Sequence, residues 1–297
     1  MDGFLNIHKP AGMTSHDVVG RVRRALKTKR VGHAGTLDPD ATGVLVVAVG
    51  QATRLLPYLP LEPKVYLATV GFGTATDTED ASGQVTATAD ASGLTEEALR
   101  SVLPRFVGEI AQVPPMVSAL HHNGQRLYDL ARQGITVERE ARTITIHALE
   151  LVAPPSLGAG GAIRVTCGGG TYIRTLCKDI GEALGLPAHM ATLVREAVGP
   201  YALADAIPLE EIDESKLLPM HEALGWPLLD VSDADAAELK LGRTIQLTPP
   251  FAKPEGVPEP CEGGGGENTC AALHNGQLLA LLRYETGRWQ PFKVFAG

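Results

Sequence analysis

The sequence predicts a mixed α/β (α+β) protein that ends in a small all-β unit. Apolar runs typical of strands occupy residues 4–7, 44–49 and 64–73, and segments with helical periodicity alternate with them. Beyond residue 226 the pattern changes to short strands separated by turns, as in a small β-barrel. These observations favour two folded units of unequal size.

The length of 297 residues also fits one large domain or two smaller ones. We expect the boundary near Trp226–Pro227, with one domain over 1–226 and another over 227–297. Hydrophobic residues make up 44% and charged residues 20%, which are ordinary values for a soluble protein. No apolar run reaches the roughly 18 residues of a membrane helix, and the first residues lack the pattern of a secretory signal. We therefore expect a cytoplasmic protein without a membrane span.

The first helix is expected after Thr14, because Asp17 three residues later completes a capping-box pattern. Its apolar residues form one stripe on a helical wheel, and its basic residues lie on the opposite side. Residues 21–30 contain six basic residues in ten, whereas residues 205–238 contain ten acids and one lysine. The net charge of −8 argues against nucleic acid, but a local basic face can still bind phosphates. The alternative is an ordinary solvated helix face.

Residues 31–43 are expected to form a loop that runs directly into the buried strand 44–49. Asp38 in this loop is therefore held by a rigid scaffold, which suits a functional residue. An aspartate before a proline is more often a simple turn former, and from the residues alone that interpretation prevails.

The strand 64–73 places Tyr66 on the face opposite to Val65 and Leu67. Its GFGTAT ending lacks the G-K-[ST] of a phosphate loop, which excludes a nucleoside triphosphate site of that type. The later elements are a helix over 94–110, a mixed stretch over 114–140, strands over 144–152 and 162–167, a low-complexity loop over 253–268, and strands over 242–247, 269–276, 277–285 and 289–295.

A helix is expected after the glycines 168–170, with Ile173, Leu176 and Ile180 on its buried stripe. Arg174 lies in its first turn, where the helix dipole disfavours a cation. The position indicates a nearby anionic partner, such as a buried carboxylate.

The cysteines are Cys167, Cys177, Cys261 and Cys270, and none falls in a C-x-x-C pair or at a zinc-ligand spacing. We expect reduced, structural thiols and no metal site. A Cys261–Cys270 disulfide is the disfavoured alternative, because disulfides are rare in the cytosol.

Five ordered blocks together resemble the bacterial tRNA pseudouridine-55 synthases, the TruB-like family. The blocks are NIHKPAGMTSHDVV (6–19), GHAGTLDPDATGVLVVAVGQATRL (32–55), KVYLATVGFGTATDTEDASG (64–83), QVPPMVSALHHNGQRLYDLARQG (112–134) and CGGGTYIRTLCKDIGEALGLPAHMATLVR (167–195). The resemblance implies a catalytic domain with a central, mostly antiparallel sheet and a thumb-like insertion at about 113–142. It also implies, on a weaker match, a C-terminal PUA-like RNA-binding barrel.

The resemblance also assigns roles to residues. It implies that Asp38 is the catalytic nucleophile, that Tyr66 stacks on the target base and moves a ribose proton, and that Arg174 pairs with Asp38. His33 would fill the space of the flipped base. The other substrate-binding residues would be Tyr172, Leu193 as an apolar wall, Lys9, Arg23 and Lys27.

The implied reaction breaks the N1–C1′ bond of uridine in the tRNA T loop and rejoins uracil through C5. This is an isomerisation without redox change, so no cofactor is expected. Asp38 can attack the substrate or stabilise a cationic sugar, and attack on the sugar and elimination through a glycal both stay open. The expected partner is the T arm of tRNA, with no obligate protein partner and a monomeric enzyme.

The chain departs from the family pattern at Val117, His121 and Gly168, which concerns RNA contacts rather than the reaction class. Two alternatives are an RNA chaperone with secondary catalysis and a guided synthase of the dyskerin type. The intact motifs argue against the first, and the thumb-like insertion argues against the second.

Overall fold

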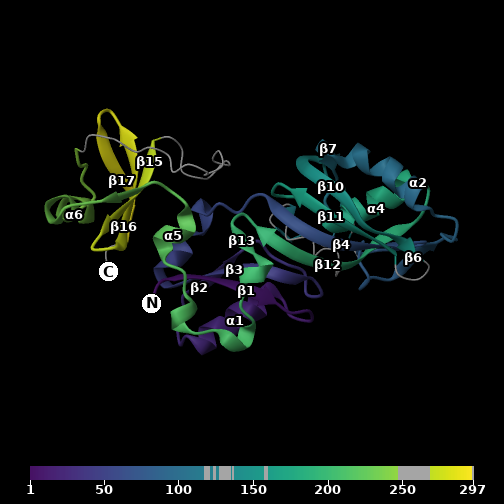
Figure 1. The fold of residues 1–297 in the computed structure, drawn as a ribbon, viewed down its shortest axis with the longest axis horizontal. Coiled ribbons are helices and arrows are strands. Elements are labelled where there is room, and N and C mark those ends of the chain that lie inside the picture. Colours follow the sequence, from purple (N-terminus) through teal and green to yellow (C-terminus); the bar gives the residue numbers. More distant parts are fainter. Residues whose placement is uncertain are drawn as a thin grey trace.

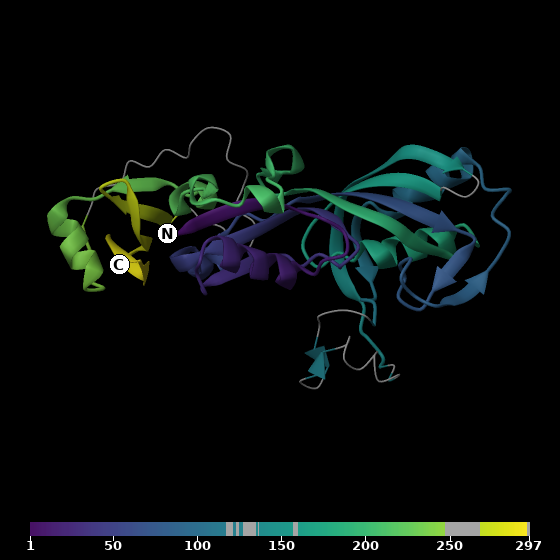
Figure 2. The same ribbon diagram turned by 90° about the horizontal axis from the view of Figure 1, so that it is seen from below.

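The computed structural model describes residues 1–116, 121–122, 125–126, 135, 137–156, 160–246 and 268–295. Its main feature is a nine-stranded sheet that runs along an elongated molecule (Figures 1 and 2). The strands of this sheet are β1 (Gly3–Lys9), β2 (Val31–Ala34), β3 (Thr42–Val49), β4 (Lys64–Phe72), β7 (Gly108–Gln112), β10 (Arg142–Ser156), β11 (Gly160–Cys167), β12 (Ala188–Val198) and β13 (Tyr201–Ala202).

The strand order is β1-β3-β12-β4-β11-β10-β7, with β2 paired to β3 and β13 paired to β12. All of these pairs are antiparallel except β3 with β12, which are parallel at Thr42–Val194 and Gly43–Arg195. The expected α+β class and mostly antiparallel sheet are confirmed. Because β12 pairs with β3 on one side and β4 on the other, it joins the two halves of the sheet.

The described residues also form helices and two small hairpins. The helices are α1 (Ser15–Ala25), α2 (Glu96–Val102), α4 (Ile173–Ala183), α5 (Met220–Leu224) and α6 (Asp233–Lys240). The 3₁₀ helices are η1 (Gly50–Tyr58), η2 (Leu103–Phe106), η3 (Leu203–Asp205), η4 (Leu209–Glu211) and η5 (Glu214–Lys216). Two small hairpins pair β5 (Thr74–Thr76) with β6 (Val85–Thr88) and β8 (His121–His122) with β9 (Gln125–Arg126).

The α1 helix begins as expected at an N-cap. The Thr14 hydroxyl accepts the backbone N–H of Asp17, and the Asp17 carboxylate accepts the N–H of Thr14. The stripe of Val18, Val19 and Val22 is buried against β1 and β3. This burial turns the basic side of the helix toward solvent.

The α4 helix packs on β12 and β4 with the expected stripe of Ile173, Leu176 and Ile180 buried in the larger core. The helix begins directly after the glycine turn that follows β11, and its first turn carries the buried Arg174.

Three expected elements differ from the structure. Residues 31–34, expected in a loop, form β2, because Val31 and Ala34 are buried against β3. The helix expected over 94–110 ends near Pro104, and Gly108, at a φ of +98°, starts strand β7. The strand expected over 242–247 is only an isolated bridge between Ile245 and Trp289 among the described residues.

Half of the residues of the expected thumb-like insertion lie outside the described residues. Its ends are fixed, because Gln112 at the end of β7 pairs with Arg142 at the start of β10. The low-complexity loop and Cys261 also lie outside the described residues, apart from Asn268. Cys167, Cys177 and Cys270 are free, buried thiols.

The C-terminal unit is an open four-stranded sheet in the order β14-β15-β16-β17, with α6 packed against it. Its strands are β14 (Leu228–Asp230), β15 (Thr269–His274), β16 (Gln277–Glu285) and β17 (Arg288–Val294). It lies at one end of the molecule (Figure 1), where Phe292 contacts Tyr58 and Trp226. A closed barrel, as the sequence led us to expect, is not formed by the described strands.

No helix in the described ranges is long and apolar enough to cross a membrane.

Gly43 provides a test of the β3–β12 join. Its φ is +108°, and a Cβ atom there would collide with the main chain of Arg195. We expect Gly43→Ala to lower the free energy of unfolding by about 3 kcal/mol or more, because strain and overpacking add. Gly225 has a φ of +62° and open space around its Cβ position, so Gly225→Ala should lose only about 1–2 kcal/mol. Urea denaturation measures the free energy of unfolding of both variants. Equal losses of stability in the two variants would contradict the close packing at Gly43.

Candidate active site

Asp38 lies in the turn that connects β2 to β3. The Ala41 N–H donates to the Asp38 carbonyl at 3.2 Å, and the Gly12 N–H donates to the Pro39 carbonyl at 3.0 Å. The Asp38 side chain is 41% exposed. The carboxylate can therefore contact a protein partner on one side and a substrate on the other.

Two buried side chains hold this turn from beneath. Lys9 donates from Nζ to the carbonyls of Pro10, Pro39 and Ala41 at 2.7–2.9 Å. The Ser15 hydroxyl accepts the N–H of Leu37 at 2.9 Å. Burial lowers the pKa of Lys9 to about 8. Lys9 was expected to bind substrate, but it is fully buried and its three N–H groups have acceptors within the protein.

Arg174 forms an ion pair with Asp38, with 3.1 Å between Nε and Oδ2. One of its terminal nitrogens lies 3.6 Å from Oδ2 of Asp80 and donates to the Thr78 carbonyl at 3.2 Å. The Arg174 side chain is only 6% exposed. The expectation that a cation in the first turn of this helix has a carboxylate partner is confirmed.

Asp80 is the second carboxylate of the site. Its Oδ1 accepts the Thr78 hydroxyl at 2.7 Å and the Ser82 N–H at 3.0 Å, which leaves Oδ2 facing Arg174. The same loop is tied to α4, because the Thr175 hydroxyl donates to Glu79 at 2.6 Å. Asp80 therefore fixes the guanidinium from the side opposite to Asp38.

The pKa of Asp38 is raised above its ordinary value, mainly by burial. The Arg174 guanidinium opposes the rise, and the charge of Asp80 adds to it. The ion pair thus opposes the effect of burial on this partly desolvated carboxylate and fixes its orientation.

Tyr66 lies on β4, directly opposite Arg195 of β12 in the antiparallel register. It is 8% exposed, and the Arg195 guanidinium interacts with it electrostatically. Burial raises the pKa of this phenol, and the charge of Asp38 contributes to the rise. Arg195 links Tyr66 to the Asp38 turn, because its guanidinium donates to the carbonyls of Gly35 and Val44 on either side of that turn.

The remaining expected residues surround these groups. His33 lies on β2, where burial lowers its pKa, and its Nδ1 has no hydrogen-bond partner within the described structure. Tyr172 is the N-cap residue of α4, and its backbone N–H and carbonyl both bond the side chain of Gln112. Leu193 is a buried residue of β12 beside Ala68.

Known families and proteins match this chain over most of its length. Residues 23–173 match the N-terminal domain of the TruB family pseudouridylate synthases, and residues 174–228 match the C-terminal domain of tRNA pseudouridylate synthase B. The chain belongs to the TruB family of pseudouridylate synthases. It is 42% identical to the tRNA pseudouridine synthase B of Dehalococcoides mccartyi, over 99% of this chain and 97% of that protein. The enzyme of the same name from Symbiobacterium thermophilum is 51% identical over 82% of each chain.

Solved structures share the fold over the whole chain. A Cbf5-Nop10-Gar1 complex and an archaeal box H/ACA sRNP Nop10-Cbf5 complex each contain a chain that is 26% identical. Their TM-scores are 0.67 and 0.66, with 99% of this chain covered and 84% and 86% of those chains.

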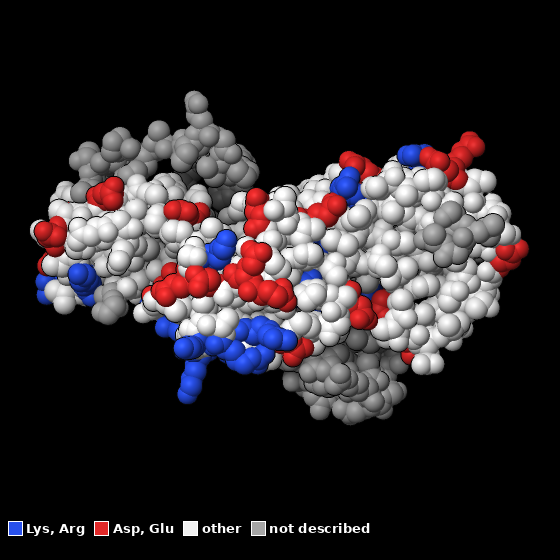
Figure 3. Space-filling model, turned by 60° about the horizontal axis from the view of Figure 1, so that its bottom comes forward, with Lys and Arg blue, Asp and Glu red and all other residues white. Residues whose placement is uncertain are grey.

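Exposed basic residues of this TruB-family chain gather along and just after α1. They include Arg23 and Lys27, both expected to bind substrate, together with Arg21, Arg24, Lys29 and Arg30. Figure 3 shows this basic face beside a band of acidic side chains. Exposed acidic residues occur in the segment 205–214. This segment packs against the core beneath α1 through Ile207, Leu209 and Ile212. The charge is therefore separated locally, although the chain is acidic overall.

Three residues of the site were not found from the sequence. Asp80 is one of several acids in residues 77–80, and nothing in the pattern distinguishes it. Gln112 and Arg195 are polar residues in strands β7 and β12, neither of which the periodicity indicated. Of the departures from the family pattern, buried Gly168 bonds the Thr145 carbonyl through its N–H, whereas Val117 and the side chain of His121 lie outside the described residues.

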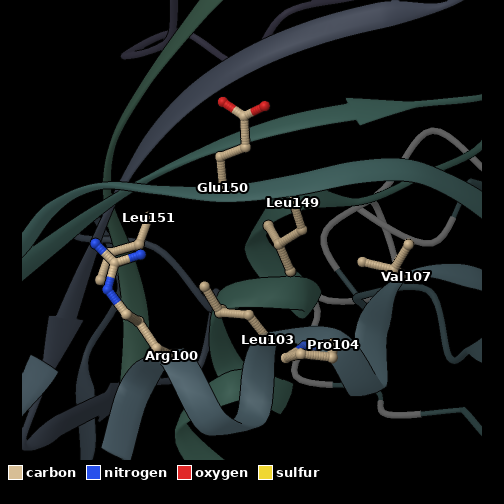
Figure 4. A pocket seen from close by; sticks show the side chains of 7 residues that line it. All are labelled: Arg100, Leu103, Pro104, Val107, Leu149, Glu150 and Leu151. Atoms are coloured by element: carbon tan, nitrogen blue, oxygen red, sulfur yellow. The ribbon is translucent and has the colours of Figure 1, made fainter. Parts of the chain in front are cut away.

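A pocket with a defined lining lies elsewhere. It is bounded by α2, η2 and β10, and none of its lining residues belongs to the Asp38 site. In Figure 4 the side chains of Leu103 and Leu149 line it, whereas Glu150 points to the other side of its strand. Within the described ranges no group of three or more His, Cys, Asp or Glu residues could hold a metal ion.

Arg174 can be tested through the titration of Asp38. Removing its charge with Arg174→Gln should raise the pKa of Asp38 further, because the guanidinium lowers that pKa and Asp80 raises it. Arg174→Lys, which keeps the charge, should cause a smaller rise. Carboxyl ¹³C NMR titration measures the pKa, and Arg164→Gln, which breaks only the exposed pair with Glu196, is the control. A pKa that is unchanged in Arg174→Gln would contradict the ion pair.

Proposed function

We propose that the chain isomerises uridine 55 in the T loop of tRNA to pseudouridine, with Asp38 as the catalytic nucleophile. The observation that carries the proposal is the Asp38–Arg174 ion pair beside Tyr66 in a chain of the TruB family. Relatives that are 42–51% identical are named tRNA pseudouridine synthase B, which supports tRNA as the substrate.

Asp38 supplies the negative charge that the reaction needs at the sugar. When the N1–C1′ bond breaks, positive charge develops on the ribose, and a fixed carboxylate either attacks that centre or stabilises it. Arg174 lies on the inner side of Asp38 and Asp80 holds Arg174, so the exposed side of the carboxylate faces the substrate. Because the geometry is fixed in advance, little reorganisation is needed during the reaction.

The target uridine must leave its stack before Asp38 can reach it. Unstacking costs on the order of a few kcal/mol, and stacking on an aromatic ring returns roughly 1–3 kcal/mol per base. Tyr66 provides the ring, and Leu193 and Tyr172 provide further walls of the uracil pocket. His33, whose Nδ1 has no described partner, fills the space that the base leaves.

The RNA backbone is held by the basic face of α1, which includes Arg23 and Lys27. Phosphate contacts of this kind set the register of the RNA without reading its sequence. We assign residues 1–226 to the catalytic domain, residues 113–142 to a thumb-like insertion that clasps the T arm, and residues 227–297 to a PUA-like RNA-binding domain. Lys9 supports the Asp38 turn from inside the protein rather than contacting RNA.

The enzyme acts as a cytoplasmic monomer without an obligate protein partner. This distinguishes it from a guided synthase of the dyskerin type, and the higher identity to the tRNA enzymes, 42–51% against 26%, supports the stand-alone form. Activity of the purified chain alone tests the distinction. A tRNA-folding chaperone would bind tRNA and show no dependence on Asp38.

The proposal is tested by tritium release from an unmodified tRNA transcript labelled at C5 of uridine. We expect about one equivalent of tritium per tRNA, and none when uridine 55 is replaced. Asp38→Asn should abolish release, because the amide carries no charge, while tRNA affinity stays within a few fold. Asp40→Asn changes an exposed aspartate in the same turn and should retain activity. Ready turnover by Asp38→Asn would refute the nucleophile, and tight binding without release by the wild type would favour the chaperone.

The basic face is tested by the salt dependence of tRNA binding. Arg23→Gln combined with Lys27→Gln should weaken binding and reduce the log–log salt slope by roughly one unit per lost phosphate contact. Arg100→Gln combined with Arg105→Gln removes two exposed cations of α2 and η2, away from the assigned binding residues, and should leave the slope unchanged. Equal slopes for the first variant and the wild type would show that α1 faces away from the RNA.

A further inference from the structure

Arg195 is a buried cation that the reaction as described does not use. It lies on β12 and is 1% exposed, the largest of the fully buried side chains in the described ranges. Removing a guanidinium from water is unfavourable by several kcal/mol unless its donors are satisfied. Burial accordingly lowers the pKa of Arg195.

Two main-chain carbonyls accept from this guanidinium. Nε donates to the Val44 carbonyl at 2.8 Å, and a terminal nitrogen donates to the Gly35 carbonyl at 2.8 Å. Gly35 lies just before the Asp38 turn, and Val44 lies just after it, in β3. Arg195 therefore clamps both ends of the segment that carries Asp38.

The third group beside this guanidinium is Tyr66, which faces Arg195 across the β4–β12 pair and interacts with it electrostatically. Within the described part of the chain, Arg195 forms no ion pair with a carboxylate. Its buried charge is directed instead at two carbonyl oxygens and one phenol.

We propose that Arg195 is a positioning residue that orients the Tyr66 hydroxyl for proton transfer and holds it in register with Asp38. The inference rests on the proposed function, since it states how Tyr66 is prepared for that reaction.

The orientation follows from the chemistry of the two groups. A guanidinium has only donors, so in a hydrogen bond between the two groups the Tyr66 oxygen is the acceptor. The phenolic proton is then directed away from Arg195. Because a neutral phenol is not a base, Tyr66 takes a proton from the substrate only when its own proton passes to another acceptor, such as the leaving uracil. The groups that act electrostatically on this phenol are Arg195 from β12, Asp38 from its turn and Cys167 from β11.

The charge of Arg195 also favours the phenolate. Arg195 opposes the rise in the Tyr66 pKa that burial and Asp38 produce. Burial raises the pKa of Cys167 to about 11, so that thiol is neutral at physiological pH. Arg195 is therefore the group that counteracts the negative charge of Asp38 at Tyr66.

The first test measures Tyr66 in the free protein, without RNA. Tyrosine is labelled with ¹³C at Cζ, and the Tyr66 resonance is assigned by its loss in Tyr66→Phe. The Tyr66 pKa should be higher in Arg195→Gln than in the wild type, with Arg195→Lys between them. Arg164→Gln removes a cation from the neighbouring strand β11 and should change nothing. An unchanged pKa in a folded Arg195→Gln protein overturns the proposal.

The second test is a double-mutant cycle on single-turnover tritium release. Arg195→Gln should slow the wild type on the order of 100-fold, within the range of a proton-transfer contribution. In the Tyr66→Phe background the same change should slow release less than about threefold, because the two residues act as one unit. If the rate effects of the two substitutions multiply, Arg195 acts independently of Tyr66 and only stabilises the fold. That result would overturn the proposal.

Arg195→Lys keeps the test decisive if Arg195→Gln does not fold. Lysine retains the positive charge but lacks the planar set of N–H donors of the guanidinium. Arg195→Lys should therefore support folding and preserve tRNA affinity, but still slow tritium release. Rate and Tyr66 pKa both equal to the wild type would overturn the proposal. If the wild type itself releases no tritium, the proposed function fails, whereas the Tyr66 titration still decides whether Arg195 controls that phenol.

Discussion

The ion pair between Arg174 and Asp38 is the interaction on which the site depends. A carboxylate in a partly desolvated turn tends to take up a proton, and the pKa of Asp38 is raised accordingly. The guanidinium that opposes this comes from the first turn of α4, where the helix dipole disfavours a cation. Asp80, from a third segment, offsets that disadvantage. Each charge is thus held in place by a neighbour of opposite sign.

Bringing these segments together requires β12. This strand pairs in parallel with β3 and antiparallel with β4, so it places the end of the Asp38 turn beside Tyr66. The close approach needs a glycine at position 43, because a side chain there would meet the main chain of Arg195. The guanidinium of Arg195 also donates hydrogen bonds to both ends of the Asp38 turn. Gly43 and Arg195 therefore determine both the join between β3 and β12 and the geometry of the Asp38 turn.

The sequence was informative where local rules determine the structure. The capping box at Thr14, the apolar strand 44–49 and the helix after residue 172 follow from short patterns, and the misplaced charge of Arg174 correctly indicated a carboxylate partner. It was uninformative where contacts between distant segments decide. Strand β12 has register shifts after Met190 and Arg195 that break its alternation, and Lys9 reads as a surface cation although the fold buries it. Neither feature has a local signal.

The net charge of the chain is also a poor guide to phosphate binding, because it does not show where the charges lie in the fold. The chain carries −8 in total, yet its exposed cations gather on α1, and the acidic segment 205–214 packs beside that helix through apolar contacts. In physiological salt each charge acts over only about 8 Å, so the acids do not cancel the basic face but limit its width. A phosphate backbone is attracted along α1 and repelled on the acidic side. In the proposed complex, the acidic segment therefore narrows the orientations in which RNA can approach, which favours those that follow the helix.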